Sequence, residues 1–109
     1  MKKKKVYLSF PIGSRDIEER RNFSAARAAF LSDVQGYEVF NPLDNGVPQS
    51  ASWREHMKQD FKIMLGCDAV FFCKDWQASC GCQLEHSVAI ACGLELIYES
   101  AHWIVDEEK

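Results

Sequence analysis

One stretch of the chain, Asp60–Gly93, constrains the fold more than any other. Within it, Asp68–Cys73 is a short apolar run of β-forming residues, and a polar loop then leads to Ser79. An amphipathic helical pattern begins at Ser79 and continues to Cys92. A buried strand that is followed by a Ser/Gly turn and a helix is a common way to build a small-molecule site. This stretch therefore predicts a strand, a helix and a candidate site between them.

The rest of the chain repeats this alternation. Three further β-forming runs predict strands at residues 6–10, 37–40 and 94–98, and two further helical patterns predict helices at 16–34 and 52–65. The second of these helices starts with a capping box, Ser52 and Glu55. The order predicts an α/β fold over residues 1–109: a single-domain flavodoxin/Rossmann-like three-layer sandwich with a four- to five-stranded, mainly parallel sheet.

Apolar spacing also predicts which helix faces are buried. In the helix at 16–34 the predicted apolar face consists of Phe23, Ala26, Ala29, Phe30 and Val34. In the helix at 79–92 the predicted inward residues are Leu84, Val88, Ala89 and Ala91. With Leu84 and Val88 inward, the Glu85 carboxylate is expected to face the crevice at the end of the sheet.

Composition limits the classes of partner. The formal net charge of −3 argues against a nucleic-acid polymer, and the one basic run, Lys2–Lys5, is interpreted as a solvated tail. No apolar stretch approaches the length of about 20 residues that a transmembrane helix needs, so no membrane partner is expected. Pro11, Gly13 and Arg15 interrupt any signal-peptide core. The five cysteines are therefore expected to be reduced thiols, and the location to be cytoplasmic.

Three segments follow the predicted strands and are expected to line one crevice: Phe10–Arg15, Asn41–Ser52 and Lys74–Ser79. In parallel sheets, ligands bind beyond the carboxyl ends of the strands, where the strand order reverses. The segment Asn41–Ser52 is long for so small a domain, and long loops are often functional.

Three residues are candidates for chemistry, and each has an ordinary alternative. Glu85 lies within about two turns of the start of its helix, where a surface acid would simply complement the helix dipole. Asp60 is on the helix before the third strand and reads equally as a solvated acid. Tyr7 in the first strand is equally an ordinary β-packing residue. Taken singly, none of them specifies a reaction.

Their combination carries a family resemblance. The relevant motifs are Val6-Tyr7-Leu8-Ser9, Gln59-Asp60 with Asp68 after it, and Ser79-x-Gly81-x-x-x-Glu85-x-x-x-Ala89. Together they resemble the nucleoside 2-deoxyribosyltransferase-like superfamily over nearly the whole chain. The pattern is also similar to a small bacterial and phage family related to 2′-deoxynucleoside 5′-phosphate N-hydrolases.

The resemblance implies cleavage of an N-glycosidic bond with retention. It assigns Glu85 as the nucleophile that forms a covalent glycosyl-enzyme, and Asp60 as the acid that protonates or orients the departing base. It assigns Tyr7 as a hydrogen-bond donor to Glu85. The scheme agrees with the chemistry of retaining glycosidases, in which two carboxyl groups flank the scissile bond.

Serine at position 79 resembles the superfamily members that act on nucleoside 5′-monophosphates, because members acting on free nucleosides tend to have aspartate there. A hydroxyl and the N–H groups of a helix start favour a phosphate. The predicted substrate-binding residues are Ser79, Gly81, Gly13, Ser14, Arg15 and Asn41. For Arg15 a solvent-facing position is the competing interpretation.

Other aromatic and polar residues leave alternatives open. Trp76 and Phe10 are candidates for stacking on a base, and packing is the other interpretation. His86 is either a second polar residue of the site or an exposed helix residue. Cys80, Cys82 and His86 lack the C-x-x-C pairs of structural zinc sites, so neither a metal nor a cofactor is expected.

The expected activity is therefore hydrolysis of a (deoxy)nucleoside 5′-monophosphate, with a nucleotide or nucleoside as the small-molecule partner. The superfamily's transferases often take an asparagine from a neighbouring subunit's C-terminus, and the tail HWIVDEEK contains none. The alternatives are a non-catalytic nucleotide- or nucleotide-sugar-binding module and a structural subunit with an empty crevice. A homodimer or higher homo-oligomer is expected to close the shallow crevice.

Overall fold

A four-stranded sheet forms the centre of the computed structural model, which describes residues 2–13 and 15–100. The strands are β1 (Lys5–Ser9), β2 (Glu38–Phe40), β3 (Ala69–Phe72) and β4 (Glu95–Tyr98). Their order across the sheet is β2-β1-β3-β4, and each neighbouring pair is parallel.

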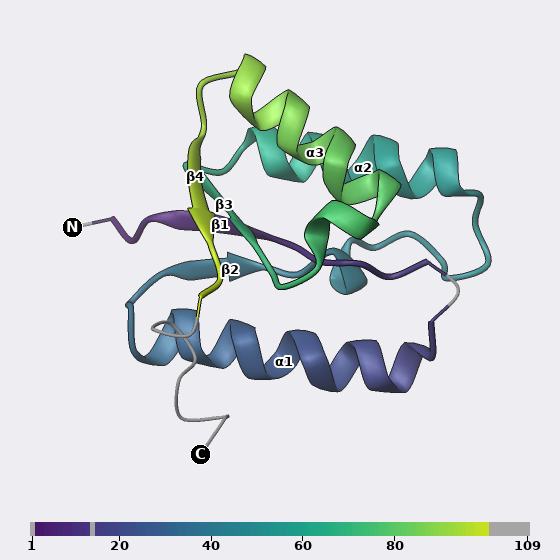
Figure 1. Ribbon diagram of the computed structural model, residues 1–109, viewed down its shortest axis with the longest axis horizontal. Coiled ribbons are helices and arrows are strands. Elements are labelled where there is room, and N and C mark those ends of the chain that lie inside the picture. The colour runs from purple at the N-terminus through teal and green to yellow at the C-terminus, as the bar shows by residue number, and fades with distance from the viewer. Residues whose placement is uncertain (1, 14, 101–109) are drawn as a thin grey trace.

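Helices cover both faces of this sheet (Figure 1). They are α1 (Ile17–Asp33), α2 (Trp53–Leu65) and α3 (Cys80–Ala91), with the short 3-10 helices η1 (Pro42–Asp44) and η2 (Trp76–Ala78) in the loops. Helix α1 lies on one face, and α2 and α3 lie together on the other. The predicted fold class is confirmed as a three-layer α/β sandwich, with a sheet of four parallel strands. None of the described helices is long and apolar enough to cross a membrane.

The topology places a switch point between β1 and β3. From β1 the chain passes through α1 to β2 on one side, and then through α2 to β3 on the other side of β1. Strands β1 and β3 end together, because Ser9 pairs in register with Phe72. In open parallel sheets a ligand site is expected beyond strand ends of this kind.

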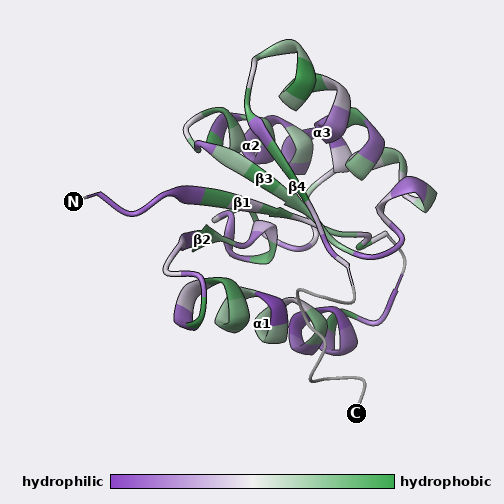
Figure 2. Cartoon of the chain, turned by 60° about the vertical axis from the view of Figure 1, so that its left-hand side comes forward, coloured by the Kyte–Doolittle hydropathy of each residue, from purple (hydrophilic) through white to green (hydrophobic). Residues whose placement is uncertain are grey.

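Alternation along the strands divides the core into two layers. Val6 and Leu8 pack in the cluster under α1, whereas Tyr7 and Val70 pack in the cluster under α2 and α3. Figure 2 shows the hydrophobic strands at the centre and hydrophilic positions along the outer helices. Because side chains alternate with a period of two, Ser9 shares the face of Tyr7 and points toward α3.

Helix ends follow the local sequence signals. The capping box of Ser52 and Glu55 starts α2, as predicted. Asp16 caps α1 by accepting from the amide of Glu18. Gly36 and Gly93 have φ of 75° and 76° where the chain leaves α1 and α3, a region that favours glycine.

The predicted apolar face of α1 is partly wrong, although Phe23 and Phe30 do pack against the core. The residues of α1 that are buried are Arg20, Ser24, Arg27 and Leu31. Val34 is 65% exposed, and Ala26 and Ala29 are also exposed. The reason is that the ring of Phe23 lies between two guanidinium groups, 4.1 Å from that of Arg20 and 3.7 Å from that of Arg27. Arginine stems and flat guanidinium groups therefore take core positions that apolar spacing assigns to alanine.

The predicted inward face of α3 is also partly wrong. Leu84 is 41% exposed and Ala91 is exposed, whereas Cys82, Glu85 and Ala89 are buried. Glu85 therefore lies on the buried face of its helix. This placement requires partners for the carboxylate, because an isolated buried charge is costly.

Candidate active site

A cavity of about 810 Å³ lies at the switch point. Its walls come from the turn after β1, the loop after β2, helix α2 and the start of α3. Six of the predicted site residues line it: Gly13, Arg15, Asp60, Ser79, Gly81 and Glu85. Segments from each of the three predicted loops therefore border the same cavity.

Glu85 is 5% exposed, and two residues of β1 donate hydrogen bonds to its carboxylate. Tyr7 Oη donates to Glu85 Oε2 at 2.8 Å, and Ser9 Oγ donates to Oε1 at 2.7 Å. The two donors lie two residues apart on β1, so they point to the same face of the sheet. Each carboxylate oxygen thus accepts one hydrogen bond from a neutral hydroxyl group, an arrangement that suits the ionised acid.

The surroundings of Glu85 move its titration toward neutral pH. Burial raises the pKa of the Glu85 carboxyl to about 7, and the nearby Asp60 adds to the rise. The hydrogen bonds from Ser9 and Tyr7 oppose it. The pKa of Tyr7 lies well above its usual value, because its hydroxyl is buried beside two carboxyl groups, so Tyr7 remains a donor. Glu85 can therefore change charge at neutral pH while its hydroxyl partners stay in place.

Asp60 lies on the cavity-facing side of α2 and is 6% exposed. Asn45 Nδ2 donates to Asp60 Oδ1 at 2.8 Å. Burial raises the pKa of Asp60, while the hydrogen bond from Asn45 and the nearby His56 oppose the rise. The cavity thus brings together two buried acids whose pKa values are both raised, as in sites that pass protons.

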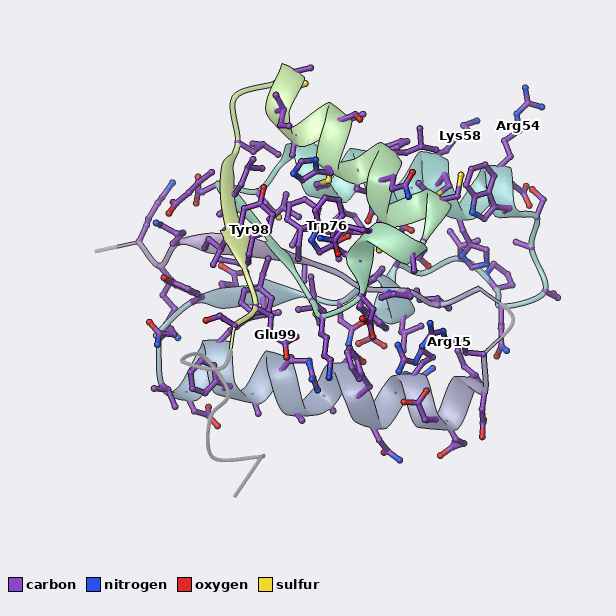
Figure 3. The ribbon with its side chains drawn as sticks, viewed as in Figure 1. Arg15, Arg54, Lys58, Trp76, Tyr98 and Glu99 are labelled. Atoms are coloured by element: carbon purple, nitrogen blue, oxygen red, sulfur yellow. The ribbon has the colours of Figure 1, made fainter. Side chains whose placement is uncertain are left out.

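The start of α3 and the turn after β1 form a different part of the cavity wall. Ser79 caps α3 by accepting from the amide of Cys82 at 3.3 Å. Gly13 has φ of 48°, and the guanidinium-bearing Arg15 follows in the same turn. Figure 3 shows Arg15 near the N-terminal end of α1, whereas Arg54 points away from the sheet. A helix N-terminus beside an arginine is a favourable setting for an anion.

The sequence matches a protein-domain family over residues 4–98, a region that includes β1 to β4 and the cavity. That family is described as a domain of unknown function, DUF4406. The chain belongs to the DUF4406 family. No curated protein matches the chain significantly.

One predicted substrate-binding residue of this DUF4406 chain, Asn41, is not among the described residues that line the cavity. Asn41 Nδ2 donates to Ser24 Oγ at 2.9 Å, and its Oδ1 accepts from the amide of Leu43 at 2.9 Å. Both polar ends of Asn41 therefore hold the loop after β2. Ser14 falls outside the described residues.

Trp76 and His86 lie in an aromatic cluster between α3 and β4. Their rings stack with centroids 4.3 Å apart, and His86 Nε2 lies 2.7 Å from Tyr98 Oη. Phe72 completes the cluster, at 5.1 Å from Trp76. Figure 3 shows Trp76 and Tyr98 beside β4. Neither Trp76 nor His86 lines the cavity, whereas Phe10 does.

Ser9, Asn45 and His56 are among the polar residues of the DUF4406 site that were not predicted as site residues. Ser9 carries a signal, because it is a hydroxyl two residues after Tyr7 in an apolar strand. His56 also carries one, because it precedes Asp60 by four residues on the same helix face. Asn45 carries none, because only the folded loop brings it to α2.

All five cysteines are free; Cys67, Cys73 and Cys82 are buried, and Cys80 and Cys92 are exposed. Burial raises the pKa of Cys82, which suits a packed thiol more than a nucleophile. Within residues 2–13 and 15–100 no group of three or more His, Cys, Asp and Glu side chains is arranged to hold a metal ion.

Proposed function

We propose that this chain hydrolyses the N-glycosidic bond of a (deoxy)nucleoside 5′-monophosphate, with Glu85 as the nucleophile. The observation that carries the proposal is the environment of Glu85: a 5% exposed carboxylate at a cavity, which accepts hydrogen bonds from the hydroxyl groups of Tyr7 and Ser9. Hydroxyl partners leave the carboxylate nucleophilic, whereas an arginine would neutralise it. The resemblance to the nucleoside 2-deoxyribosyltransferase-like superfamily supports the same role.

In the first step, a Glu85 oxygen attacks the anomeric carbon, and the bond from that carbon to the base nitrogen breaks. The electron pair stays on the base, which takes a proton from Asp60. Asp60 is placed for this role by its position on the cavity wall, and burial raises the pKa of its carboxyl group above the usual value. The products of this step are a free base and a sugar phosphate that is esterified to Glu85.

In the second step, water attacks the anomeric carbon and the bond to Glu85 breaks. The Asp60 carboxylate takes a proton from that water, so both acids return to their starting states. Two inversions at one carbon give overall retention. Tyr7 and Ser9 stabilise Glu85 each time it leaves as a carboxylate.

The phosphate is assigned to the wall formed by Gly13, Arg15, Ser79 and Gly81. Ser79 lies six residues before Glu85, which is about 9 Å along a helix. This separation suits a ligand whose reacting carbon and anionic group are distinct. No carboxylate stands at position 79 to repel phosphate.

The experiment is a screen of nucleoside 5′-monophosphates and the matching nucleosides for released base, measured by liquid chromatography. Release from nucleotides, together with a sugar-phosphate adduct on the peptide that contains Glu85, supports the proposal. Binding of nucleotides without release would instead favour a non-catalytic nucleotide-binding module on this fold. Release without dependence on Glu85 would overturn the nucleophile assignment.

A homo-oligomer belongs to the same proposal. Trp53 lines the cavity and is nevertheless 58% exposed, so its ring is available to a neighbouring copy. Light scattering at micromolar concentration is expected to give a mass above that of one chain. A purely monomeric protein with full activity would remove the oligomer from the proposal.

A further inference from the structure

His56 is a half-buried residue that lines the cavity and has no role in the two steps described above. It lies one helical turn before Asp60, so the two side chains are neighbours on one face of α2. A titratable ring at this place is a candidate for contact with the same part of the substrate that Asp60 serves, the departing base.

Asn45 determines which ring nitrogen of His56 carries the hydrogen. Asn45 Oδ1 accepts from the amide of Val47 at 2.8 Å, so its amino group points the other way, toward α2. That amino group donates to Asp60 Oδ1 at 2.8 Å and lies 3.3 Å from His56 Nδ1. An amide NH2 has two hydrogens and no acceptor site, so His56 Nδ1 must be the acceptor. The neutral ring therefore carries its hydrogen on Nε2.

This arrangement leaves a donor without a protein partner in the described part of the chain, because His56 Nε2 makes no hydrogen bond there. The ring lines the cavity, and its Nδ1 is already bonded to the wall. A ligand that fills the cavity would displace water from this N–H, which would then need an acceptor on the ligand.

We propose that His56 is a specificity-determining residue that reads the departing base. Its Nε2–H donates to a keto oxygen of the base, and the site discriminates against bases that carry an amino group in that place. An amino group would put two donors face to face, and a site built around a hydrogen bond rejects the analogue that lacks the partner. This inference rests on the proposed N-glycosidase function and specifies its substrate class as keto bases.

The test uses two substrate pairs, each with a keto and an amino member. Deoxyinosine and deoxyadenosine 5′-monophosphates differ by keto or amino at one ring carbon and by the hydrogen on the neighbouring ring nitrogen, and so do deoxyuridine and deoxycytidine 5′-monophosphates. For at least one pair, the wild type is expected to prefer the keto member by about tenfold or more in kcat/KM. In His56→Ala and His56→Phe the ratio is expected to fall to about twofold or less. His56→Gln keeps an N–H donor and is expected to retain part of the preference.

Lys58→Ala is the matched control, because Lys58 is exposed on the same helix and points away from the sheet (Figure 3). A merely structural role for His56 would lower both members of a pair equally and leave the ratio unchanged, which would overturn the inference. A wild type without keto preference in either pair would also overturn it and leave the proposed function standing. If no nucleotide releases its base, both this inference and the proposed function are overturned.

Discussion

Among the described residues, two glutamates have largely buried side chains, one on each face of the sheet, and their partners differ. Glu99 follows β4 and receives two hydrogen bonds from Arg27, at 3.1 Å and 3.0 Å, and one from the amide of Lys74 at 2.9 Å. Figure 3 shows Glu99 directed toward α1. Glu85 receives its two hydrogen bonds from the hydroxyl groups of Tyr7 and Ser9, and within the described residues no ion pair reaches it.

The difference separates a carboxylate that holds the fold from one that is available for chemistry. A bidentate arginine compensates the charge of Glu99 and occupies both of its oxygens. Hydroxyl groups leave the charge of Glu85 uncompensated, and burial then raises its pKa to about 7. A protein that needed only a packed polar residue at position 85 would gain stability from a neutral side chain. The proposed reaction would account for the cost of keeping glutamate there.

The largest effect is expected from Glu85→Gln, which tests whether Glu85 is the nucleophile. If Glu85 is the nucleophile, this change is expected to lower the rate of base release by about three orders of magnitude or more, because the amide cannot form the glycosyl-enzyme. The measurement is single-turnover release of base from the best nucleotide of the screen. Glu95→Gln is the matched control, because Glu95 is an exposed glutamate of β4. Equal losses in the two variants would contradict the assignment.

The second prediction concerns the other glutamate. Arg27→Met leaves Glu99 largely buried without its cation, and the free energy of unfolding is expected to fall by about 3–5 kcal/mol. Denaturant unfolding followed by circular dichroism measures this. The double change Arg27→Met with Glu99→Met removes both charges and is expected to recover most of the loss. A single variant as stable as the wild type would show that the ion pair contributes nothing to the fold.

Much of the architecture could be predicted because its signals are local. The apolar run of β3 and the capping box at Ser52 each specify one element through neighbouring residues. The interior of α1 could not be predicted in the same way. Arg27 is buried because it pairs with Glu99, which lies 72 positions away along the chain. Apolar spacing contains no information about such a partner.

The candidate site shows the same limit. The residue types and positions of Asp60 and Glu85 indicated candidate site residues, and the family resemblance implied their roles. The hydrogen bond from Ser9 depends on which way β1 faces when α3 packs on it, and the bond from Asn45 depends on the path of a loop. Hydrogen-bond partners such as Ser9 and Asn45 can be identified only when several segments are brought together in three dimensions.

The third prediction follows from the raised pKa of Glu85. Its value of about 7 in the folded chain lies above the ordinary 4.5, so its contribution to stability is fully present below pH 4.5 and is lost as pH rises through 7. Glu85→Gln removes this dependence. The free energy of unfolding of the variant, relative to that of wild type, is therefore expected to rise by about 1–3 kcal/mol between pH 5 and pH 8.5. Unfolding curves at several pH values measure the gain. Glu95→Gln serves again as control, and a difference for Glu85→Gln that stays flat with pH would contradict the burial argument.

The fourth and smallest expected effect comes from Ser9→Ala, which removes one of the two bonds that lower the pKa of Glu85. The pKa of Glu85 is then expected to rise further above its usual value, so less of the carboxyl group is ionised at neutral pH. We expect kcat/KM at pH 7 to fall by about three- to tenfold and to recover as pH rises toward 8.5, because the remaining carboxylate still attacks. Ser24→Ala is the matched control, since Ser24 is a fully buried serine on α1, on the other face of the sheet. If kcat/KM of Ser9→Ala is lowered by the same factor at every pH, Ser9 positions Glu85 without changing its pKa.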